Sequence, residues 1–216
     1  MNIGILGTGT VGETIGAKLI ELGHTVKLGS RSASNEKAAE WAAQQGTKAS
    51  VGTFAEAAAF GELLFNCTNG NGCMDALASA GEENLRGKVL IDVSNPLDFS
   101  NGFPPSLTVC NTDSLAEQLQ RAHPTTRVVK SLNTVTAAVM VNPALLAAET
   151  DIFVSGEDAE AKAQVTAILR DWFGWKSVID LGGISTARAV EAWLLLWVNL
   201  MGPMGGPLFN LKLIRK

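Results

Sequence analysis

The feature that most constrains the fold of this chain is a glycine-rich segment at its N-terminus. A short apolar run, Ile3 to Leu6, leads directly into the sequence Gly7-Thr8-Gly9-Thr10-Val11-Gly12, and apolar residues at helical spacing follow. A strand, a GxGxxG turn and a helix in this order are typical of a dinucleotide-binding βαβ unit. Its glycines permit a tight turn, a close approach of the pyrophosphate and close packing of the helix on the sheet. The first N–H groups of the helix attract phosphate. The segment therefore predicts a dinucleotide site.

The end of the next predicted strand indicates which dinucleotide binds. Residues 25–28 form the strand, and Gly29-Ser30-Arg31-Ser32 follows without a carboxylate. In folds that prefer NAD, an acidic residue here binds the ribose 2′-hydroxyl. The Arg31 guanidinium can instead hold a 2′-phosphate, with hydroxyls donated by Ser30 and Ser32. We therefore expect NADP(H); the alternative is that Arg31 is an ordinary solvent-facing loop residue.

The remainder of the chain alternates predicted strands and helices. Strands are predicted at 49–51, 63–67, 88–93, 127–132, 151–154 and 176–181, and helices at 35–45, 53–60, 114–121, 158–173 and 185–200. With 216 residues, the chain is long enough for one α/β domain and an extension. We predict an α/β fold of Rossmann type, a doubly wound, mostly parallel sheet with a small C-terminal helical cap. Residues 1–132 are expected to form the NADP-binding Rossmann domain, and residues 133–216 the sheet extension and the C-terminal helical cap and dimerisation region.

Three polar segments that follow predicted strands extend the expected cofactor site. They are Thr68 and Asn69, then Ser94, Asn95 and Pro96, then Asn133 and Thr134. Because the carboxyl ends of parallel strands meet at the edge where open α/β sheets bind ligands, we expect all of them beside the glycine turn. Asn95-Pro96 fits turn chemistry as well as it fits a contact to the nicotinamide or its ribose. Residues 98–105, which contain glycine and proline, are expected to form a loop or lid.

Composition excludes several other classes of function. The net charge of −4 argues against a nucleic-acid or membrane-surface role. The three cysteines, Cys67, Cys73 and Cys110, have no metal-ligand spacing and fit a reducing compartment, so we expect a cytoplasmic protein without a metal site. The longest apolar run, Trp193 to Val198, is far shorter than the roughly 20 residues of a membrane helix.

The residues available for acid–base chemistry are few. The chain has no tyrosine, which excludes the Tyr-x-x-x-Lys pair of short-chain dehydrogenases, and its two histidines, His24 and His123, are expected at the surface. Reduction of a carbonyl needs a proton donor, for which Lys130 is a weak candidate. A flavin-like ring spreads the incoming charge itself, so the protein need only align two rings. We therefore favour hydride transfer between a nicotinamide and a second redox cofactor, with no catalytic residue beyond those that position the rings.

Besides the glycine turn and Leu28-Gly29-Ser30-Arg31, the chain has a late segment with the sequence Gly182-Gly183-Ile184-Ser185-Thr186-Ala187-Arg188-Ala189-Val190-Glu191. In these three segments the sequence resembles the coenzyme F420-dependent NADP oxidoreductases and the related reductase domain of STEAP metalloreductases. The resemblance implies that Thr8, Ser30 and Arg31 surround the 2′-phosphate of NADPH. It also implies a small-molecule acceptor, either the deazaflavin F420 or a flavin such as FAD or FMN, and a homodimer built largely by the C-terminal helices.

The predicted helix 185–200 is apolar nearly all round, with Trp193 and Trp197 four residues apart. Such a helix is buried either in its own core or against a second copy of the chain. Two other functions remain open at this point: an NADP(H)-binding redox sensor without turnover, and a small imine reductase.

Overall fold

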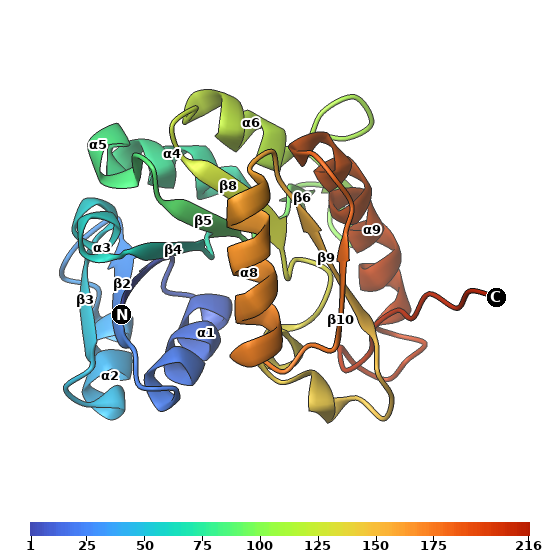
Figure 1. Ribbon diagram of the computed structural model, residues 1–216, viewed down its shortest axis with the longest axis horizontal. Helices are drawn as coiled ribbons and strands as arrows, with labels where there is room; N and C mark the ends of the chain where they lie inside the picture. Colours follow the sequence, from blue (N-terminus) through green and yellow to red (C-terminus); the bar gives the residue numbers. More distant parts are fainter.

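A computed structural model describes all residues, 1–216, and consists of one large sheet between helices and a separate two-stranded ribbon (Figure 1). The large sheet has eight strands in the order β10-β9-β8-β5-β4-β1-β2-β3. Their bounds are β1 Asn2–Leu6, β2 Thr25–Ser30, β3 Ala49–Thr53, β4 Leu63–Asn66, β5 Val89–Asp92, β8 Arg127–Ser131, β9 Asp151–Ser155 and β10 Ser177–Asp180. The strands all run parallel to their neighbours except β8 and β9, which pair antiparallel.

The helices connect these strands in the predicted alternation. They are α1 Thr10–Glu21, α2 Glu36–Gln45, α3 Phe54–Phe60, α4 Gly70–Ala80, α5 Glu82–Leu85, α6 Leu115–Ala122, α7 Ala137–Val141, α8 Ala159–Asp171 and α9 Ala187–Leu200, with 3-10 turns at Pro143–Leu145 and Ile184–Thr186. None of these helices is both long enough and apolar enough to cross a membrane.

Alternating side chains in the strands build a core on each face of the sheet. In β1, Ile3 and Ile5 join a core with residues of α1, α2, α7 and α8, whereas Leu6 joins a core with residues of α3, α4, α5 and α6. In Figure 1, α4, α5 and α6 lie above the sheet and α1 lies below it. Burial on both faces explains why the central strands read as continuous apolar runs. The predicted fold, a doubly wound and mostly parallel sheet, is confirmed.

The last two strands extend the sheet rather than form a separate layer. Lys130 of β8 pairs with Ser155 of β9, and β10 then pairs parallel to β9. The larger core contains residues from both sides of position 132, for example Val129 and Val154. The division into residues 1–132 and 133–216 stays a prediction.

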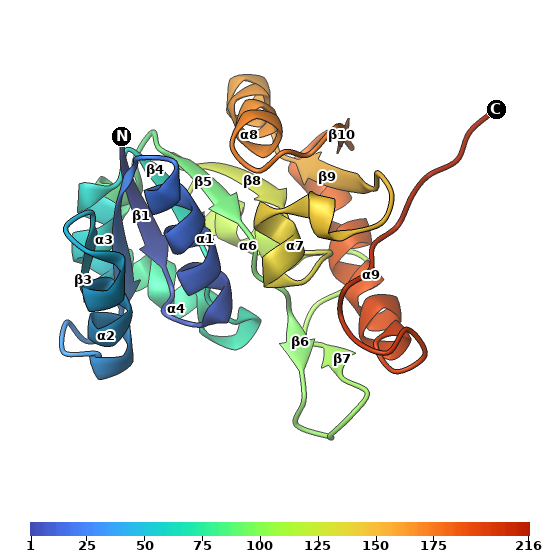
Figure 2. The ribbon, with the colours of Figure 1, turned by 90° about the horizontal axis from the view of Figure 1, so that it is seen from below.

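A short ribbon follows β5. Its strands, β6 (Leu97–Asp98) and β7 (Ser106–Leu107), hold residues 99–105 between them. Figure 2 shows this hairpin projecting beyond the body of the molecule on the side toward which β1 points. The segment expected to form a loop or lid, 98–105, is therefore largely the loop of a hairpin whose two strands have two residues each.

Three helices, α4, α5 and α7, were not predicted from the sequence pattern. Residues 68–72 read as a polar loop, but α4 begins at Gly70, and the Asn69 side chain accepts a hydrogen bond of 2.9 Å from the Gly72 N–H. This N-cap bond satisfies a free helical N–H and offsets the low helix propensity of the two glycines. The short α7 follows the polar pair Asn133 and Thr134, in a stretch for which no helix was predicted.

Candidate functional site

The predicted site residues lie along one edge of the sheet. Strands β2, β1, β4, β5 and β8 are consecutive neighbours and parallel, so their carboxyl ends share this edge. The segments at these ends carry every predicted contact: Gly7 to Gly12 after β1, Ser30 to Ser32 at β2, Thr68 and Asn69 after β4, Ser94 to Pro96 after β5, and Asn133 and Thr134 after β8. The fold thus orders them across the edge, with β2 at one end and β8 at the other.

The three glycines of the turn have three different surroundings. Gly7 has φ +122°, and a Cβ there would meet the Cys67 carbonyl oxygen at 2.6 Å. A Cβ on Gly12 would meet the Gly7 carbonyl oxygen at 2.5 Å. A Cβ on Gly9 would meet nothing within 4 Å, and Gly9 is also the N-cap of α1 without a side-chain cap. The first turn of α1 therefore presents free N–H groups to open space, which is the arrangement that binds a phosphate.

The β2 end of the edge carries an unpaired positive charge. Arg31 is exposed, and none of the ion pairs in the chain involves it. The Ser30 hydroxyl donates to the Ser32 carbonyl oxygen at 2.5 Å and shapes the loop that holds Arg31. Asn35, which the sequence marked only as a helix start, donates from Nδ2 to the Thr8 hydroxyl at 3.2 Å. This bond ties the glycine turn to the β2 loop.

The loops after β5 and β8 are bonded to each other. Asn95 donates to the Asn133 carbonyl oxygen at 3.0 Å, and Asn133 donates to Asn95 Oδ1 at 2.9 Å. Gly70, at the start of α4, lies directly against this pair, because a Cβ there would meet the Asn95 carbonyl oxygen at 2.2 Å. The Asn133 amide also donates to the Val190 carbonyl oxygen of α9 at 3.1 Å. The two asparagines therefore join three elements at the edge.

Thr134 has a buried hydroxyl with no partner. The residue is 2% exposed, and its Oγ1 makes no hydrogen bond. The hydroxyls of Thr68 and Ser94, by contrast, donate to Asn66 and Asp92 at 2.7 Å each. A buried polar group normally has a partner. Thr134 is therefore the predicted site residue whose hydrogen-bonding capacity is still open.

A buried ionic network lies beneath the β5 loop. Lys130 Nζ is 2.8 Å from Asp92 Oδ2 and 2.8 Å from Glu191 Oε1, and it donates to the Ser94 carbonyl oxygen at 2.5 Å. All three charged side chains are at most 2% exposed. Burial alone would lower the pKa of Lys130, but the two carboxylates outweigh it, and the pKa lies above its ordinary value. Lys130 is therefore enclosed by its three partners, which argues against a role as a proton donor to a ligand.

The histidines are remote from this edge. His24 follows α1 at the amino end of β2, where its ring packs on Trp172. His123 is 7% exposed, so its expected surface position is wrong; its Nδ1 lies 3.0 Å from a carboxylate oxygen of Glu82. Neither imidazole is available to a ligand at the carboxyl edge. No group of three or more His, Cys, Asp or Glu residues could hold a metal ion.

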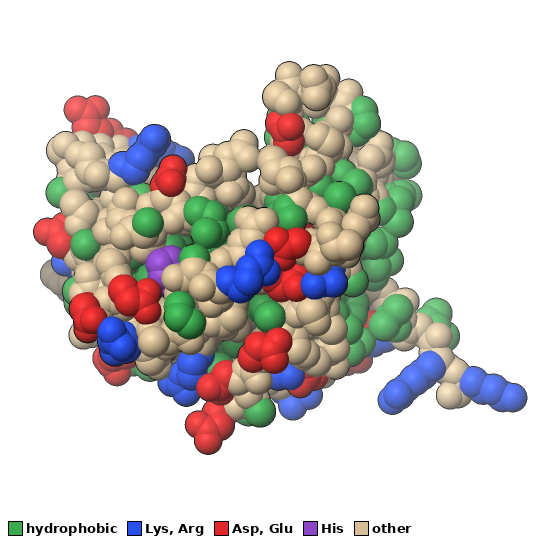
Figure 3. Space-filling model, turned by 90° about the horizontal axis from the view of Figure 1, so that it is seen from above, with side chains coloured by type: hydrophobic (Ala, Val, Ile, Leu, Met, Phe, Trp, Pro, Cys, Tyr) green, Lys and Arg blue, Asp and Glu red, His purple; other side chains and the backbone are tan.

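The projecting hairpin gives the β5 end of the site an apolar rim. Thr108 donates from its N–H to the Pro96 carbonyl oxygen at 2.8 Å, so the hairpin is rooted in the β5 loop. Phe99 and Phe103 are 54% and 69% exposed. Figure 3 shows the hairpin as a lobe at the top of the view, beside a notch in the surface. Two aromatic rings thus stand free near the predicted nicotinamide end.

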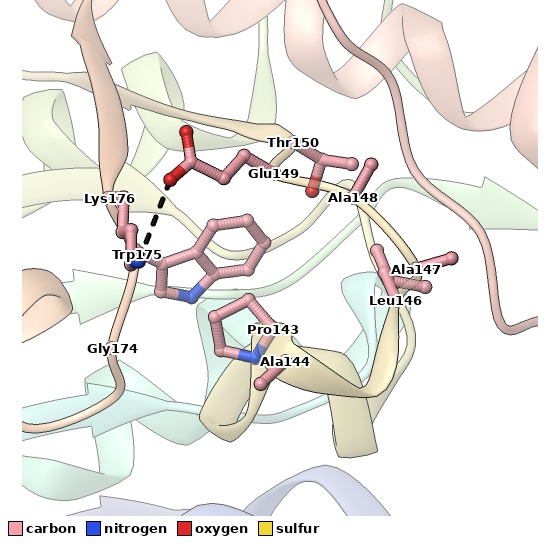
Figure 4. A pocket seen from close by; sticks show the side chains of 10 residues that line it. All are labelled: Pro143, Ala144, Leu146, Ala147, Ala148, Glu149, Thr150, Gly174, Trp175 and Lys176. Atoms are coloured by element: carbon pink, nitrogen blue, oxygen red, sulfur yellow. Dashed lines mark ion pairs between the residues drawn. The ribbon is translucent and has the colours of Figure 1, made fainter.

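A pocket open to solvent lies elsewhere, between the segment after α7 and the start of β10 (Figure 4). It has a volume of about 270 Å³ and is lined largely by small apolar side chains and by Trp175. Glu149 and Lys176 form an ion pair of 3.7 Å at its rim. None of its lining residues belongs to the predicted cofactor site.

The chain is similar to known NADP oxidoreductases. Residues 2–96 match the model of a family described as NADP oxidoreductase, coenzyme F420-dependent. A solved structure from Arthrobacter sp. FB24, provisionally described as an F420-dependent NADP reductase, is 45% identical with a TM-score of 0.93, and the match covers 99% of each chain.

Two curated proteins are also similar. The F420-dependent NADP reductase of Methanothermobacter marburgensis is 29% identical over 209 residues, which are 93% of this chain and 92% of that protein. The rat metalloreductase STEAP3 is 30% identical over 191 residues, which are 88% of this chain but only 36% of STEAP3. The chain thus spans about a third of STEAP3 and nearly the whole of the archaeal reductase.

Proposed function

The chain belongs to the family of coenzyme F420-dependent NADP oxidoreductases and is thus an NADP-dependent oxidoreductase, and we propose that it transfers hydride between NADPH and a deazaflavin or flavin ring. One observation carries this proposal. The carboxyl edge has a free cation at its β2 end, whereas the ionisable groups near the β5 and β8 loops, Asp92 and Lys130, are buried and paired with each other. Such an edge can bind and align a dinucleotide but offers no mobile proton.

The residues present fit NADP(H). We place the 2′-phosphate between Arg31, Thr8 and the serines Ser30 and Ser32, and the pyrophosphate at the uncapped start of α1, with Thr10 and Val11 in its first turn. Two observations support this placement: the open space at Gly9 and the unpaired Arg31 guanidinium. In a doubly wound sheet the second half of a dinucleotide lies across the switch point, here beyond β1 toward β4 and β5.

The nicotinamide half then lies at the loops after β4, β5 and β8. When bound, the reduced nicotinamide supplies a hydride without needing a protein acid. Thr68, Asn69, Asn95, Asn133 and the peptide around Ser94 and Pro96 orient this half, and the open hydroxyl of Thr134 is available to a polar group of the ligand. Their work is alignment of two rings and exclusion of water.

The acceptor side favours a planar ring. Phe99 and Phe103 are exposed on a hairpin that grows out of the β5 loop, and aromatic side chains pack well on flat ring systems. A small carbonyl substrate would need a proton donor in place of these rings. We therefore place the deazaflavin or flavin between the hairpin and the loops after β5 and β8.

An acceptor screen tests the proposal. Purified protein is mixed with NADPH and, in separate reactions, with F420, FMN or FAD, and the loss of NADPH absorbance is followed. We expect turnover with at least one ring acceptor and none with simple ketones or imines. NADPH binding without turnover on any ring acceptor would contradict hydride transfer and favour the sensor; turnover on imines alone would favour an imine reductase.

A further inference from the structure

We propose that Glu191, acting through Lys130, is a positioning residue that fixes the β5 loop for the nicotinamide half of the dinucleotide. The inference rests on the proposed function, since it assumes that NADP(H) lies across the carboxyl edge. Glu191 lies on α9, far along the chain from the glycine turn, and does not itself reach the edge of the sheet. Its effect on the ligand is transmitted through its contacts.

The contacts form a continuous path from α9 to the β5 loop. Glu191 Oε1 is 2.8 Å from Lys130 Nζ, which in turn binds the Ser94 carbonyl oxygen at 2.5 Å. Asp92, the second partner of Lys130, accepts from the Ser94 N–H at 3.2 Å and from the Ser94 hydroxyl at 2.7 Å. Ser94 is therefore held at its N–H, its carbonyl and its hydroxyl by one charged network.

The neighbouring residue of α9 holds the second loop. The Val190 carbonyl oxygen accepts from Asn133, and Asn133 and Asn95 are bonded to each other in both directions. Two consecutive residues of α9 thus brace the loops after β5 and β8. These are the loops that we assign to the nicotinamide half, whereas the Arg31 end has no contact with this network.

Stability alone does not explain why the network is charged. The network buries two carboxylates and one ammonium, so it carries one excess negative charge. The N–H groups of Leu115 and Ala116, at the start of α6, stabilise this charge by donating to Glu191 at 2.8 and 3.1 Å. Burying such groups costs several kcal/mol per ion, and apolar residues of similar volume are often as stable. A charged network does, however, impose one geometry, because every oxygen has a fixed donor.

The chain offers a matched control in Glu117. This carboxylate lies on α6, is 7% exposed, and binds Arg188 of α9 through Nε at 2.8 Å. Glu117 and Glu191 therefore both fasten α9 to α6, but only Glu191 contacts Lys130. A role that consists only of fastening α9 predicts the same effect for both residues.

The test compares the binding of two probes to the wild-type protein, Glu191→Gln and Glu117→Gln. The probes are NADPH and adenosine 2′,5′-bisphosphate, which lacks the nicotinamide half; dissociation constants come from calorimetry. In Glu191→Gln the side-chain NH2 group faces another donor, either the Lys130 ammonium or an N–H group of α6, so one hydrogen bond of the network is lost. We expect the advantage of NADPH over the bisphosphate to fall by about tenfold in Glu191→Gln, the scale of one lost buried hydrogen bond. Glu117→Gln should keep the wild-type ratio.

The outcomes separate the inference from the proposed function. Equal ratios in all three proteins, or equal losses in both variants, would overturn the positioning role of Glu191. A wild-type protein that binds neither probe would instead contradict the proposed NADP(H) site. Circular dichroism shows whether Glu191→Gln folds. If it does not, Glu191→Asp replaces it, because this variant keeps the charge but its shorter side chain does not reach Lys130. The ratio of the dissociation constants for NADPH and the bisphosphate is then compared in the same way.

Discussion

Arg31 is the one charged residue among the predicted cofactor contacts, and it gives the sharpest prediction at the scale of single residues. Its guanidinium is exposed and unpaired, so Arg31→Ala removes no internal contact. We expect Arg31→Ala to weaken NADPH binding by roughly 1.5–3 kcal/mol, the scale of charge-assisted hydrogen bonds, and to leave NADH binding nearly unchanged. Fluorescence titration with both dinucleotides measures the difference.

Lys37 provides the control for this prediction. It lies in the first turn of α2, and its ammonium is 3.1 Å from Glu13 of α1, so it adds positive charge to the same edge without being free to grip a phosphate. Lys37→Ala should therefore weaken NADPH binding much less than Arg31→Ala does. Similar losses in the two variants, or equal losses of NADPH and NADH in Arg31→Ala, would contradict a direct contact between Arg31 and the 2′-phosphate.

The three cysteines should differ in reactivity. Burial and the nearby Asp92 charge raise the pKa of Cys73 to about 11 and the pKa of Cys67 further, whereas Cys110 is exposed. Since the thiolate is the reactive form, a raised pKa suppresses reaction at neutral pH. We expect a thiol reagent at pH 7 to modify the exposed Cys110 rapidly, the partly exposed Cys67 slowly, and the fully buried Cys73 only after denaturation. Peptide mapping by mass spectrometry identifies the modified residue; rapid labelling of Cys67 or Cys73 at pH 7 would contradict the prediction.

At the scale of elements, α3 allows a local sequence signal to be tested. Thr53 and Glu56 form the predicted capping box: Thr53 Oγ1 accepts from the Glu56 N–H at 3.2 Å, and a Glu56 carboxylate oxygen accepts from the Thr53 N–H at 2.7 Å. Thr53→Ala should lower the free energy of unfolding by about 1 kcal/mol, whereas Thr53→Ser should stay near wild type. Denaturant titration measures both.

The same box has a pH dependence of known sign. The hydrogen bonds from Thr53 lower the pKa of Glu56. A carboxyl whose folded-state pKa is lowered stabilises the protein above its unfolded-state pKa, and this contribution is lost as the pH falls through the lowered value. The difference between Thr53→Ala and wild type should therefore shrink in acid. An unchanged difference would show that the bond from the Thr53 hydroxyl to the Glu56 carboxylate, 3.1 Å long, contributes nothing.

Elements were predictable where local chemistry and periodicity agreed. The capping box of α3 and the apolar run of β4 needed no tertiary information. The start of α4 did not show in the pattern, because Gly70 is required there by the approach of the Asn95 backbone, a contact between segments distant in sequence. Tertiary packing thus overrode helix propensity at that point.

The candidate site likewise contains some residues that the sequence alone predicted and others whose roles depend on the tertiary structure. The glycine turn and Arg31 are local signals, and sequence alone predicted them. The pairing of Asn95 with Asn133 and the enclosure of Lys130 by Asp92 and Glu191 depend on which strands are neighbours and on where α9 packs. Without that order, Lys130 is only a lysine near the carboxyl end of a predicted strand, which is why the sequence suggested a proton donor.

At the scale of the whole molecule, α9 is not covered by its own chain. Val190, Leu194 and Val198 are buried, but Leu196 is 50% exposed, and Trp193 and Trp197 are only partly buried. The C-terminal tail packs back on this helix through the stacked rings of Trp197 and Phe209. Figure 3 shows hydrophobic side chains gathered down the right-hand side of the body, next to the tail. The structure thus excludes burial of this helix entirely within one chain, which was one of the two alternatives for its apolar surface.

We therefore expect a homodimer that buries this face of α9. Burial of a leucine side chain is worth about 1.5–3 kcal/mol, and an unpaired carboxylate in the same place is strongly unfavourable, so Leu196→Asp should convert the dimer to a monomer of 22.7 kDa. Leu145→Asp is the control, because Leu145 is equally exposed, at 51%, but lies in the 3-10 turn after α7. Light scattering after size exclusion gives the masses. A wild-type monomer, or a Leu196→Asp variant that remains dimeric, would place the apolar face of α9 outside any subunit interface.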